Sequence, residues 1–554
     1  MNNNIIFNKN MLSLSSRNNK LAISLGNIEP SQMVSFKKSK KGPIIPILKM
    51  GAQERPLHST IDPEREGLRY YSKSKASGYI VFLGLGAAYH IRPFLEQSDI
   101  SEILIIDKDI SLFKALLSNL DLSQFILNSR VKFLIDPDSE TVKKYLLSNY
   151  LPAVSGNLHI LNLRSRFSIE ETYFTGILTG IEDLLESLSD DFSVQSHFGE
   201  RWFINTLSNL KTAQSVKNIL PPIKKALITG AGPSLEFQLP SLKKHRKSSF
   251  LIATDTSLPF LIKNQIKPDL VISIDCQHIT FHHFFAGFPK DVPLVLDLAS
   301  PAWLTRQSDN IVFFTSGHPF SRFVNSNWRS FPYIDTSGGN VSHAAISLAD
   351  KLGAKEILLY GVDFSYPQGK SYARGTYLYP YFMSTSNRFI TSESSFVSFI
   401  FYNKKTVSKQ KSFGISYTTA PMISYKQRLE KASINLNAKI IQIEGRGETM
   451  ELQKKDLTSH NIINITPFFS AGSTSNSWNE FLNDYSEKLK NLPAPGISLS
   501  EYYSRLNSDQ KDLCTTLYPS AAALRRSGNK KVNGAMILKD AIDWTIHQIN
   551  DYLP

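Results

Sequence analysis

Two turns of small residues constrain the fold of this chain more than any other feature. The first, Gly230-Ala-Gly-Pro-Ser234, follows the apolar run 226–229, and the second, Thr336-Ser-Gly-Gly-Asn340, precedes a run with the period of a buried helix. Glycine leaves the backbone N–H groups of a turn accessible, and N–H groups at the start of a helix commonly bind a phosphate. The sequence therefore predicts an α/β domain that holds a nucleotide-linked donor between the two turns.

Apolar runs that alternate with helical patterns predict two parallel sheets. The strands predicted for the first sheet are 79–83, 102–106, 131–135 and 158–161. Those predicted for the second are 226–229, 250–254, 270–274, 294–296, 311–314 and 357–360. Residues 169–218 have a helical period, and the short apolar pieces Leu21–Leu25 and Ile44–Leu48 are interpreted as strands.

We therefore assign the chain to the α/β class and divide it into four regions. They are a strand-rich N-terminal lead (1–60), an N-terminal Rossmann-like domain (61–185), a central doubly wound Rossmann-like domain (186–455) and a C-terminal helical region (456–554). In the central domain, we expect the strands 226–229, 250–254, 270–274 and 357–360 to share one parallel sheet.

The composition excludes several classes of protein. Cys276 and Cys514 are the only cysteines, too few for a disulfide framework or a cysteine metal site. No apolar run approaches the roughly 20 residues that span a bilayer, and the first residues do not resemble a secretory signal. We therefore expect a cytoplasmic protein that is not integral to a membrane. The net charge of +14 comes from scattered basic clusters without a known nucleic-acid module, so we expect no nucleic-acid partner.

Two predicted strands of the central domain end on carboxylates, Asp255 and Asp275. Ligands of open α/β sheets bind at the carboxyl ends of the strands. Both side chains are therefore placed to contact a ribose, a base or a reacting hydroxyl. The alternative for each is a structural role as a helix cap or turn residue.

The two small-residue turns supply the predicted phosphate contacts. Gly230, Gly232 and Ser234 form the first, and no lysine follows them as it would in a Walker P-loop. The hydroxyl of Ser337 and the N–H groups of Gly338 and Gly339 form the second. A purely structural strand-to-helix connection remains the alternative for the first turn.

Tyr366 and Tyr372 follow the predicted strand 357–360. Their hydroxyls could donate hydrogen bonds to a departing phosphate. The alternative is that both are half-buried aromatic side chains of a loop.

A third glycine turn, Gly84-Leu-Gly86, lies in the N-terminal domain, and Asp107 ends the strand after it. This arrangement is typical of dinucleotide or S-adenosylmethionine sites, but Tyr89 occupies the position of the third glycine. A bound cofactor and a degenerate scaffold both remain open.

Several of these segments together resemble the motility accessory factor (Maf) family of flagellin glycosyltransferases, whose central domain is similar to a pterin pyrophosphokinase. The segments are the first glycine turn, Ile274-Asp275, Leu352-Gly-Ala-Lys-Glu-Ile-Leu-Leu-Tyr-Gly-Val-Asp-Phe-Ser-Tyr366, Lys370-Ser-Tyr-Ala373, Tyr417-Thr-Thr-Ala-Pro-Met422 and Ile441-Gln-Ile-Glu-Gly445. The same motifs resemble small bacterial sialyltransferases that use CMP-linked sialic acid.

The sialyltransferase resemblance implies roles for individual residues. Thr336, Ser337 and Gly338 would contact the nucleotide, and Tyr366 and Tyr372 would assist the leaving group. The chain departs from that family where it has Ala231 and Asp255 in place of asparagines, and it has no histidine at the place of the family's general base. Asp275, His318 and Glu393 are the candidates for a substitute base.

The resemblance implies a protein O-glycosyltransferase that moves a nonulosonic, sialic-acid-like sugar from a CMP-linked donor to Ser or Thr of flagellin. A donor with a single phosphate makes less demand on a metal ion, so we expect no required cofactor and no metal site. The alternatives are an enzyme similar to 6-hydroxymethylpterin pyrophosphokinase and a non-catalytic chaperone that binds flagellin.

Overall fold

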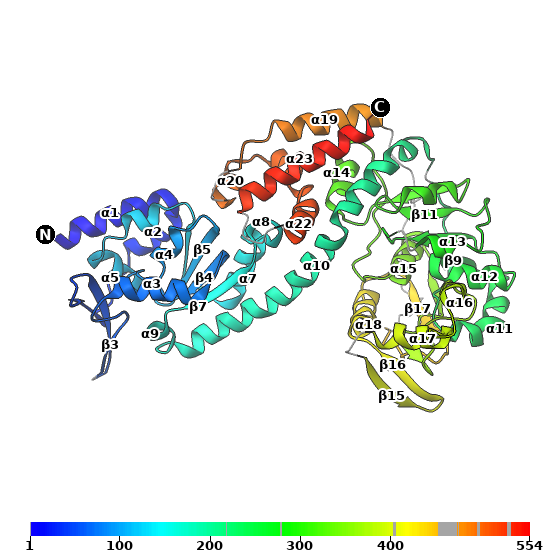
Figure 1. The fold of residues 1–554 in the computed structure, drawn as a ribbon, viewed down its shortest axis with the longest axis horizontal. Helices are drawn as coiled ribbons and strands as arrows, with labels where there is room; N and C mark the ends of the chain where they lie inside the picture. Colours follow the sequence, from blue (N-terminus) through cyan, green and yellow to red (C-terminus); the bar gives the residue numbers. More distant parts are fainter. Residues whose placement is uncertain are drawn as a thin grey trace. The chain divides into compact units, whose positions relative to one another are not determined.

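The computed structural model describes residues 2–51, 53–217, 219–277, 280–402, 406–452, 474, 476–495, 499–528 and 533–553. It divides into two compact units (Figure 1). The first unit contains Met1–Glu200 and Ser486–Gln548, and the second contains Arg201–Tyr485 and Ile549–Pro554. The start predicted for the C-terminal helical region, residue 456, lies outside the described residues.

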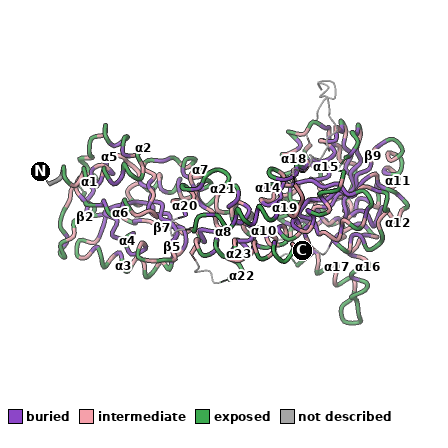
Figure 2. Tube along the Cα trace, turned by 90° about the horizontal axis from the view of Figure 1, so that it is seen from above, coloured by how far each residue is buried: buried purple, intermediate pink, exposed green. Residues whose placement is uncertain are grey.

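The first unit is built on a four-stranded parallel sheet in the order β6-β5-β4-β7. Its strands are β4 (Gly78–Leu83), β5 (Ile100–Asp107), β6 (Val131–Ile135) and β7 (Leu158–Asn162). Alternate residues of β4 enter two different cores, Ile80 and Phe82 on one face and Tyr79 and Val81 on the other. The central strands β4 and β5 are buried on both faces, so the sequence shows apolar runs there, whereas β7 is half-buried along its whole length (Figure 2). All four predicted strands are confirmed.

Seven helices precede, connect or follow the strands of this sheet along the described part of the chain. They are α3 (Pro63–Ser74), α4 (Arg92–Leu95), α5 (Ile110–Asn119), α6 (Ser123–Leu127), α7 (Ser139–Asn149), α8 (Pro152–Ser155) and α9 (Arg164–Phe167). The helix predicted from residue 169 onward is confirmed as α10 (Glu171–Ser215), a single helix of 45 residues.

The N-terminal lead differs in part from the prediction. It begins with α1 (Asn2–Arg17) and α2 (Asn19–Gly26), and only then forms an antiparallel sheet of β1 (Val34–Lys38), β2 (Ile44–Met50) and β3 (Gln53–Pro56). The strand predicted at Leu21–Leu25 is wrong. The Asn18 side chain caps α2 by accepting the Leu21 N–H, and Ala22 and Leu25, three residues apart, join the core beneath. The strand predicted at Ile44–Leu48 is confirmed within β2.

The second unit contains a seven-stranded parallel sheet in the order β12-β11-β10-β9-β8-β13-β17. Its strands are β8 (Lys225–Thr229), β9 (Phe250–Thr254), β10 (Leu270–Ser273), β11 (Leu294–Asp297), β12 (Ile311–Phe314), β13 (Glu356–Tyr360) and β17 (Lys439–Gln442). The prediction of one shared parallel sheet is confirmed. The strand order reverses between β8 and β13, which is where doubly wound folds bind ligands.

Short helices connect the strands of this sheet. They are α11 (Ser234–Arg246), the 3₁₀ turn η1 (Asp255–Ser257), α12 (Leu258–Lys263), α13 (Phe281–Phe284), η3 (Ala302–Arg306), α14 (Pro319–Asn327) and α15 (Val341–Lys351). Helix α15 forms part of the main core of the unit through buried residues such as Ala345 and Leu348.

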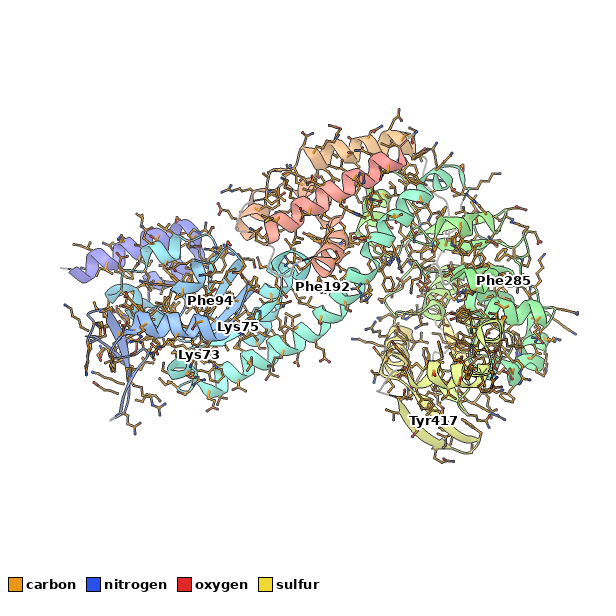
Figure 3. The ribbon with its side chains drawn as sticks, in the orientation of Figure 1. Lys73, Lys75, Phe94, Phe192, Phe285 and Tyr417 are labelled. Atoms are coloured by element: carbon orange, nitrogen blue, oxygen red, sulfur yellow. The ribbon has the colours of Figure 1, made fainter. Side chains whose placement is uncertain are left out.

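The segment between β13 and β17 forms a separate layer that the sequence analysis did not resolve. A small antiparallel sheet combines β14 (Tyr366–Pro367), β16 (Gly414–Thr418) and β15 (Val407–Lys411). Helices α16 (Leu378–Thr385), α17 (Ser392–Phe401) and α18 (Ala420–Ser433) belong to the same segment. Tyr366 lies opposite Tyr417 in the strand register, and Tyr417 is labelled in Figure 3.

The C-terminal part is helical, as predicted. Its helices are α19 (Trp478–Lys490), α20 (Leu499–Arg505), α21 (Ser508–Thr515), α22 (Tyr518–Ser527) and α23 (Gly534–Tyr552). Among the described helices of the chain, none combines the length and the apolarity that a membrane-crossing helix requires.

Candidate functional site

The residues predicted for the site follow the carboxyl ends of the central sheet. Gly230 follows β8, Asp255 follows β9, and Asp275 lies two residues beyond β10. A cavity of about 330 Å³ lies at the opposite edge, lined by residues 222–225, 248–250 and 269, which precede or begin β8, β9 and β10. Because ligands of such sheets bind at the carboxyl ends, we place the candidate site there and not in that cavity.

The first glycine turn is packed against the loop that follows β13. The Gly232 N–H donates to the Gly361 carbonyl at 2.8 Å, and the Ser234 N–H donates to Oδ2 of Asp363 at 2.8 Å. A Cβ at Gly230 would lie 2.6 Å from the Gly361 carbonyl oxygen. The N–H groups of Gly232 and Ser234, predicted to face a phosphate, are therefore used within the chain.

The same turn holds the loop that carries Tyr372. The Ala373 N–H donates to the Ala231 carbonyl at 2.8 Å. Glu236, in the first turn of α11, accepts a hydrogen bond from the Arg374 N–H at 2.7 Å and from Nζ of Lys370 at 3.2 Å. The glycine turn thus contributes to the site by positioning Tyr372.

Three tyrosine side chains and two carboxylates come together beside this loop. The rings of Tyr372 and Tyr377 lie 6.1 Å apart. Burial raises the pKa of Tyr377 to about 12, and the charges of Asp255 and Asp275 add to the rise. Burial also raises the pKa of Tyr372, with further contributions from Tyr377, Tyr366 and Asp255. The structure therefore brings together four residues selected from the sequence and adds Tyr377, which was missed.

The hydroxyls of these tyrosines are available to a ligand. Those of Tyr366, Tyr372 and Tyr377 make no hydrogen bond to a residue that the structure describes. Because their pKa values are raised, the phenols stay protonated at neutral pH and act as donors.

The carboxylate of Asp255 is buried, and both of its oxygens accept hydrogen bonds from the protein. Its Oδ2 accepts the Ser273 hydroxyl at 2.6 Å, and its Oδ1 accepts the Thr256 N–H at 2.7 Å. Asp275 is half-buried, and Oδ1 of Asp275 accepts the Gln277 N–H at 2.9 Å. Burial raises the pKa of Asp275, and the negative charge of Asp255 raises it further. The contact predicted between Asp255 and a nucleoside stays a prediction, and its burial favours a structural or positioning role.

The second glycine turn leads into the N-terminus of α15. Asn340 caps the helix by accepting the His343 N–H at 3.0 Å, and the Gly339 N–H donates to the Thr336 carbonyl at 2.9 Å. The Ser337 N–H is bound by Asp335 at 2.9 Å. The N–H groups of Gly338, Val341 and Ser342 remain as donors at the positive end of the helix dipole.

Helix α18 adds two side chains to this turn that the sequence analysis missed. Nη1 of Arg428 donates to the Ser337 carbonyl at 3.2 Å, which places a positive charge beside the turn. A Cβ at Gly339 would lie 2.7 Å from Cε1 of Tyr425. Tyr425 also contributes to the raised pKa of Tyr372. The turn, Tyr425 and Tyr372 therefore line one region, with a cation and several hydrogen-bond donors.

His318 lies in a different environment. Its Nε2 is 3.8 Å from Oδ2 of Asp297, and its ring stacks on Trp202 with centroids 4.1 Å apart. Asp297 ends β11 and His318 follows β12, so this pair belongs to the far strands of the sheet. Burial lowers the pKa of His318, although Asp297 opposes the change. Glu393 is exposed in the first turn of α17.

The glycine turn of the N-terminal domain is filled by its own side chains. Nε of Arg166 donates to Oδ1 of Asp107 at 2.9 Å, and the Leu85 N–H donates to Oδ2 at 2.8 Å. A Cβ at Gly84 would lie 2.9 Å from Arg166. The carboxylate that would bind a ribose is therefore occupied, which favours the degenerate scaffold over a bound cofactor.

Comparison with known proteins bears on the family and the fold of the chain. Residues 201–369 match the family model described as 6-hydroxymethylpterin diphosphokinase MptE-like. Two uncharacterized proteins of Treponema pallidum are each 34% identical to the chain, over 31% and 27% of its length. The matches cover 84% of the first relative and 54% of the second.

Residues 201–369 of the chain belong to the MptE-like family. The structure of a Maf glycosyltransferase from Magnetospirillum magneticum AMB-1 matches the whole chain with a TM-score of 0.58. The match covers 99% of this chain and 96% of the other at 15% sequence identity. At 15% identity this likeness shows the fold. The resemblance to the Maf family that the sequence predicted is therefore confirmed for the fold.

We expect Asp363 to make the free energy of unfolding of the second unit depend on pH. Burial raises the pKa of this carboxyl to about 6, although the Ser234 N–H opposes the rise. Because the folded-state value exceeds the usual ~3.9, the stabilisation is full below about pH 4 and is lost as the pH rises through about 6. As the pH rises from about 4 to above 6, the free energy of unfolding of the wild type should fall by about 3 kcal/mol relative to that of Asp363→Asn. Urea denaturation across this pH range, followed by hydrogen exchange in β8 and β13, measures the difference, and parallel curves would contradict it.

Proposed function

We propose that the chain is a protein O-glycosyltransferase that moves a nonulosonic, sialic-acid-like sugar from a CMP-linked donor to Ser or Thr of flagellin. One observation carries the proposal. At the carboxyl edge of the sheet, the tyrosine hydroxyls of the site, which make no hydrogen bond to a described residue, lie in one region with the N-terminus of α15 and with Arg428. Such a site supplies hydrogen bonds and positive charge to a phosphate that gains charge as it departs.

Each part of the proposal has its own support. The Maf fold supports sugar transfer, and the tyrosine and glycine motifs similar to those of sialyltransferases support a CMP-linked donor. The single phosphate of such a donor can be neutralised by these protein groups, so we propose no required metal or cofactor. Flagellin as acceptor follows from the family resemblance, and with it we propose a cytoplasmic location.

A second candidate is 6-hydroxymethylpterin diphosphokinase activity, because the matching family model carries that description. This reaction would transfer a diphosphate from ATP and would require Mg²⁺ to bridge the phosphates. The two candidates therefore differ in the nucleotide that the central unit binds.

Titration calorimetry of the full chain with CMP, and separately with ATP and Mg²⁺, distinguishes the candidates. Binding of CMP alone supports the transferase, and binding of ATP with Mg²⁺ supports the kinase. Binding of neither nucleotide, together with binding of flagellin, would indicate a non-catalytic chaperone. Transfer of sugar from a CMP-linked nonulosonic acid to flagellin, detected as a mass increase of the acceptor, then tests the activity itself.

Gly338→Ala tests the position of the donor phosphate. A Cβ at Gly338 would lie 1.5 Å from Nδ1 of His343, whose side chain is buried. We expect the turn to be displaced, at a cost of about 1–3 kcal/mol in stability, and CMP binding to be lost. Gly176→Ala is a matched control, since no described atom beyond its own turn of helix lies within 4 Å of the added methyl group. CMP affinity equal to that of the wild type in Gly338→Ala would place the phosphate elsewhere.

A further inference from the structure

A histidine that the sequence analysis did not select lies among the tyrosines of the central site. His283, in the short helix α13, is 4% exposed, and its ring lies 4.6 Å from the ring of Tyr377 between centroids. Its Nδ1 is 3.4 Å from Oδ2 of Asp255. The negative charge of Asp275 also interacts with His283. The imidazole is therefore enclosed by groups that the candidate site already contains.

The carboxylate beside His283 has a fixed orientation. Ser273 donates to Oδ2 of Asp255 and Thr256 donates to Oδ1, so both oxygens are held by hydrogen bonds. The 3.4 Å separation from Nδ1 exceeds a normal hydrogen bond, but catalytic hydrogen bonds are often long before substrate binds. A small movement of either ring or loop would close the contact.

The two nitrogens of the imidazole are in different situations. Nδ1 is buried and makes no hydrogen bond within the described part of the chain, so a proton on Nδ1 is best satisfied by Asp255. Nε2 is not among the buried nitrogens that lack a partner and makes no hydrogen bond to a described residue. With the proton on Nδ1, Nε2 is the basic nitrogen, because a neutral imidazole carries one proton.

We propose that His283, oriented by Asp255, is the general base that deprotonates the acceptor hydroxyl. This assignment rests on the proposed function. The acceptor oxygen forms a bond to the anomeric carbon of the sugar, and its proton moves to Nε2 of His283. The bond between that carbon and the donor phosphate breaks, and its electron pair leaves with the phosphate, to which Tyr372 donates a hydrogen bond.

The other candidates fit this role less well. The side chain of His318 stacks on Trp202 beside Asp297, and it makes no ring contact or hydrogen bond with the three described tyrosines of the site. The side chain of Asp275 is hydrogen-bonded to the Gln277 N–H, and no described group orients it toward an acceptor as Asp255 orients His283. Asp255 itself is buried, so it acts through His283 as a positioning residue.

Transfer by variants of the full chain tests the assignment. His283→Ala should lower kcat with a hydroxyl acceptor by about 10²–10⁴ and leave the Kd for CMP unchanged. Azide is already an anion and needs no base, so His283→Ala should form the glycosyl azide at the wild-type rate. Asp255→Asn should show the same pattern, because its side chain no longer holds the proton on Nδ1. His282→Ala removes the neighbouring imidazole and should transfer normally.

The possible results separate the two proposals. A wild-type chain that neither binds CMP nor transfers sugar overturns the proposed function, and the base assignment falls with it. If the wild type is active, undiminished hydroxyl transfer by His283→Ala overturns the base assignment alone. Loss of the azide reaction together with hydroxyl transfer also overturns it, since His283 would then be needed for more than proton removal. His283→Gln, which preserves much of the side-chain volume, replaces His283→Ala if the latter does not fold.

Discussion

Replacing Tyr372 by phenylalanine is expected to lower the kcat of sugar transfer by about 10²–10³ while CMP binds almost as tightly as before. The hydroxyl makes no hydrogen bond to the described residues, and its raised pKa keeps it a donor at neutral pH. A donor directed at a departing phosphate stabilises the transition state more than the bound substrate. Single-turnover transfer and calorimetry with CMP measure the two effects separately.

Tyr402→Phe is the matched control, because this side chain is 91% exposed and the substitution removes the same atom. The double variant Tyr366→Phe, Tyr372→Phe is expected to be slower than either single variant. Transfer at the wild-type rate by that double variant would mean that the sugar–phosphate bond is not broken in this pocket.

Arg166→Met is expected to lower the free energy of unfolding of the first unit by about 3–5 kcal/mol. Arg166 is 1% exposed and Asp107 is 3% exposed. Oδ1 of Asp107 accepts two hydrogen bonds, one from Nε of Arg166 and one from the Lys108 N–H. Removing the guanidinium leaves a buried negative charge without a cation. Urea denaturation with hydrogen exchange in β4 and β5 measures the loss.

Arg164→Met provides the comparison, because Arg164 lies in the same short helix α9 but is exposed. This change should alter stability by less than about 0.5 kcal/mol. Adding Asp107→Asn to Arg166→Met should recover part of the lost stability, since the unpaired charge is then absent. Equal effects of the two arginine substitutions would show that the buried pair does not stabilise the unit.

The sheets could be predicted from the sequence, and parts of the site could not. Parallel strands buried on both faces leave continuous apolar runs in the sequence. The acidic residues after 250–254 and 270–274 indicated the edge of the sheet at which we place the candidate site. By contrast, α2 was predicted as a strand because a short apolar run fits both structures, and only its packing on the core decides between them.

The missed site residues come from elements whose position depends on tertiary structure. Arg428 and Tyr425 lie on α18, in the layer inserted between β13 and β17, and nothing in their local sequence indicates that they face the turn before α15. His283 could have been noticed as part of a histidine pair soon after Asp275. The reverse error concerns the first glycine turn, whose N–H groups looked open but are bound by Gly361 and Asp363.

The anchoring of the Tyr372 loop has a consequence for the thermodynamics of ligand binding. Two hydrogen bonds to Glu236 and one to Ala231 already hold this loop without any ligand. A nucleotide that binds here does not have to bring order to a free segment, which would otherwise oppose association by an entropy cost for each residue fixed. Affinity for the donor can therefore come from few contacts, and release of the spent nucleotide does not require the loop to unfold.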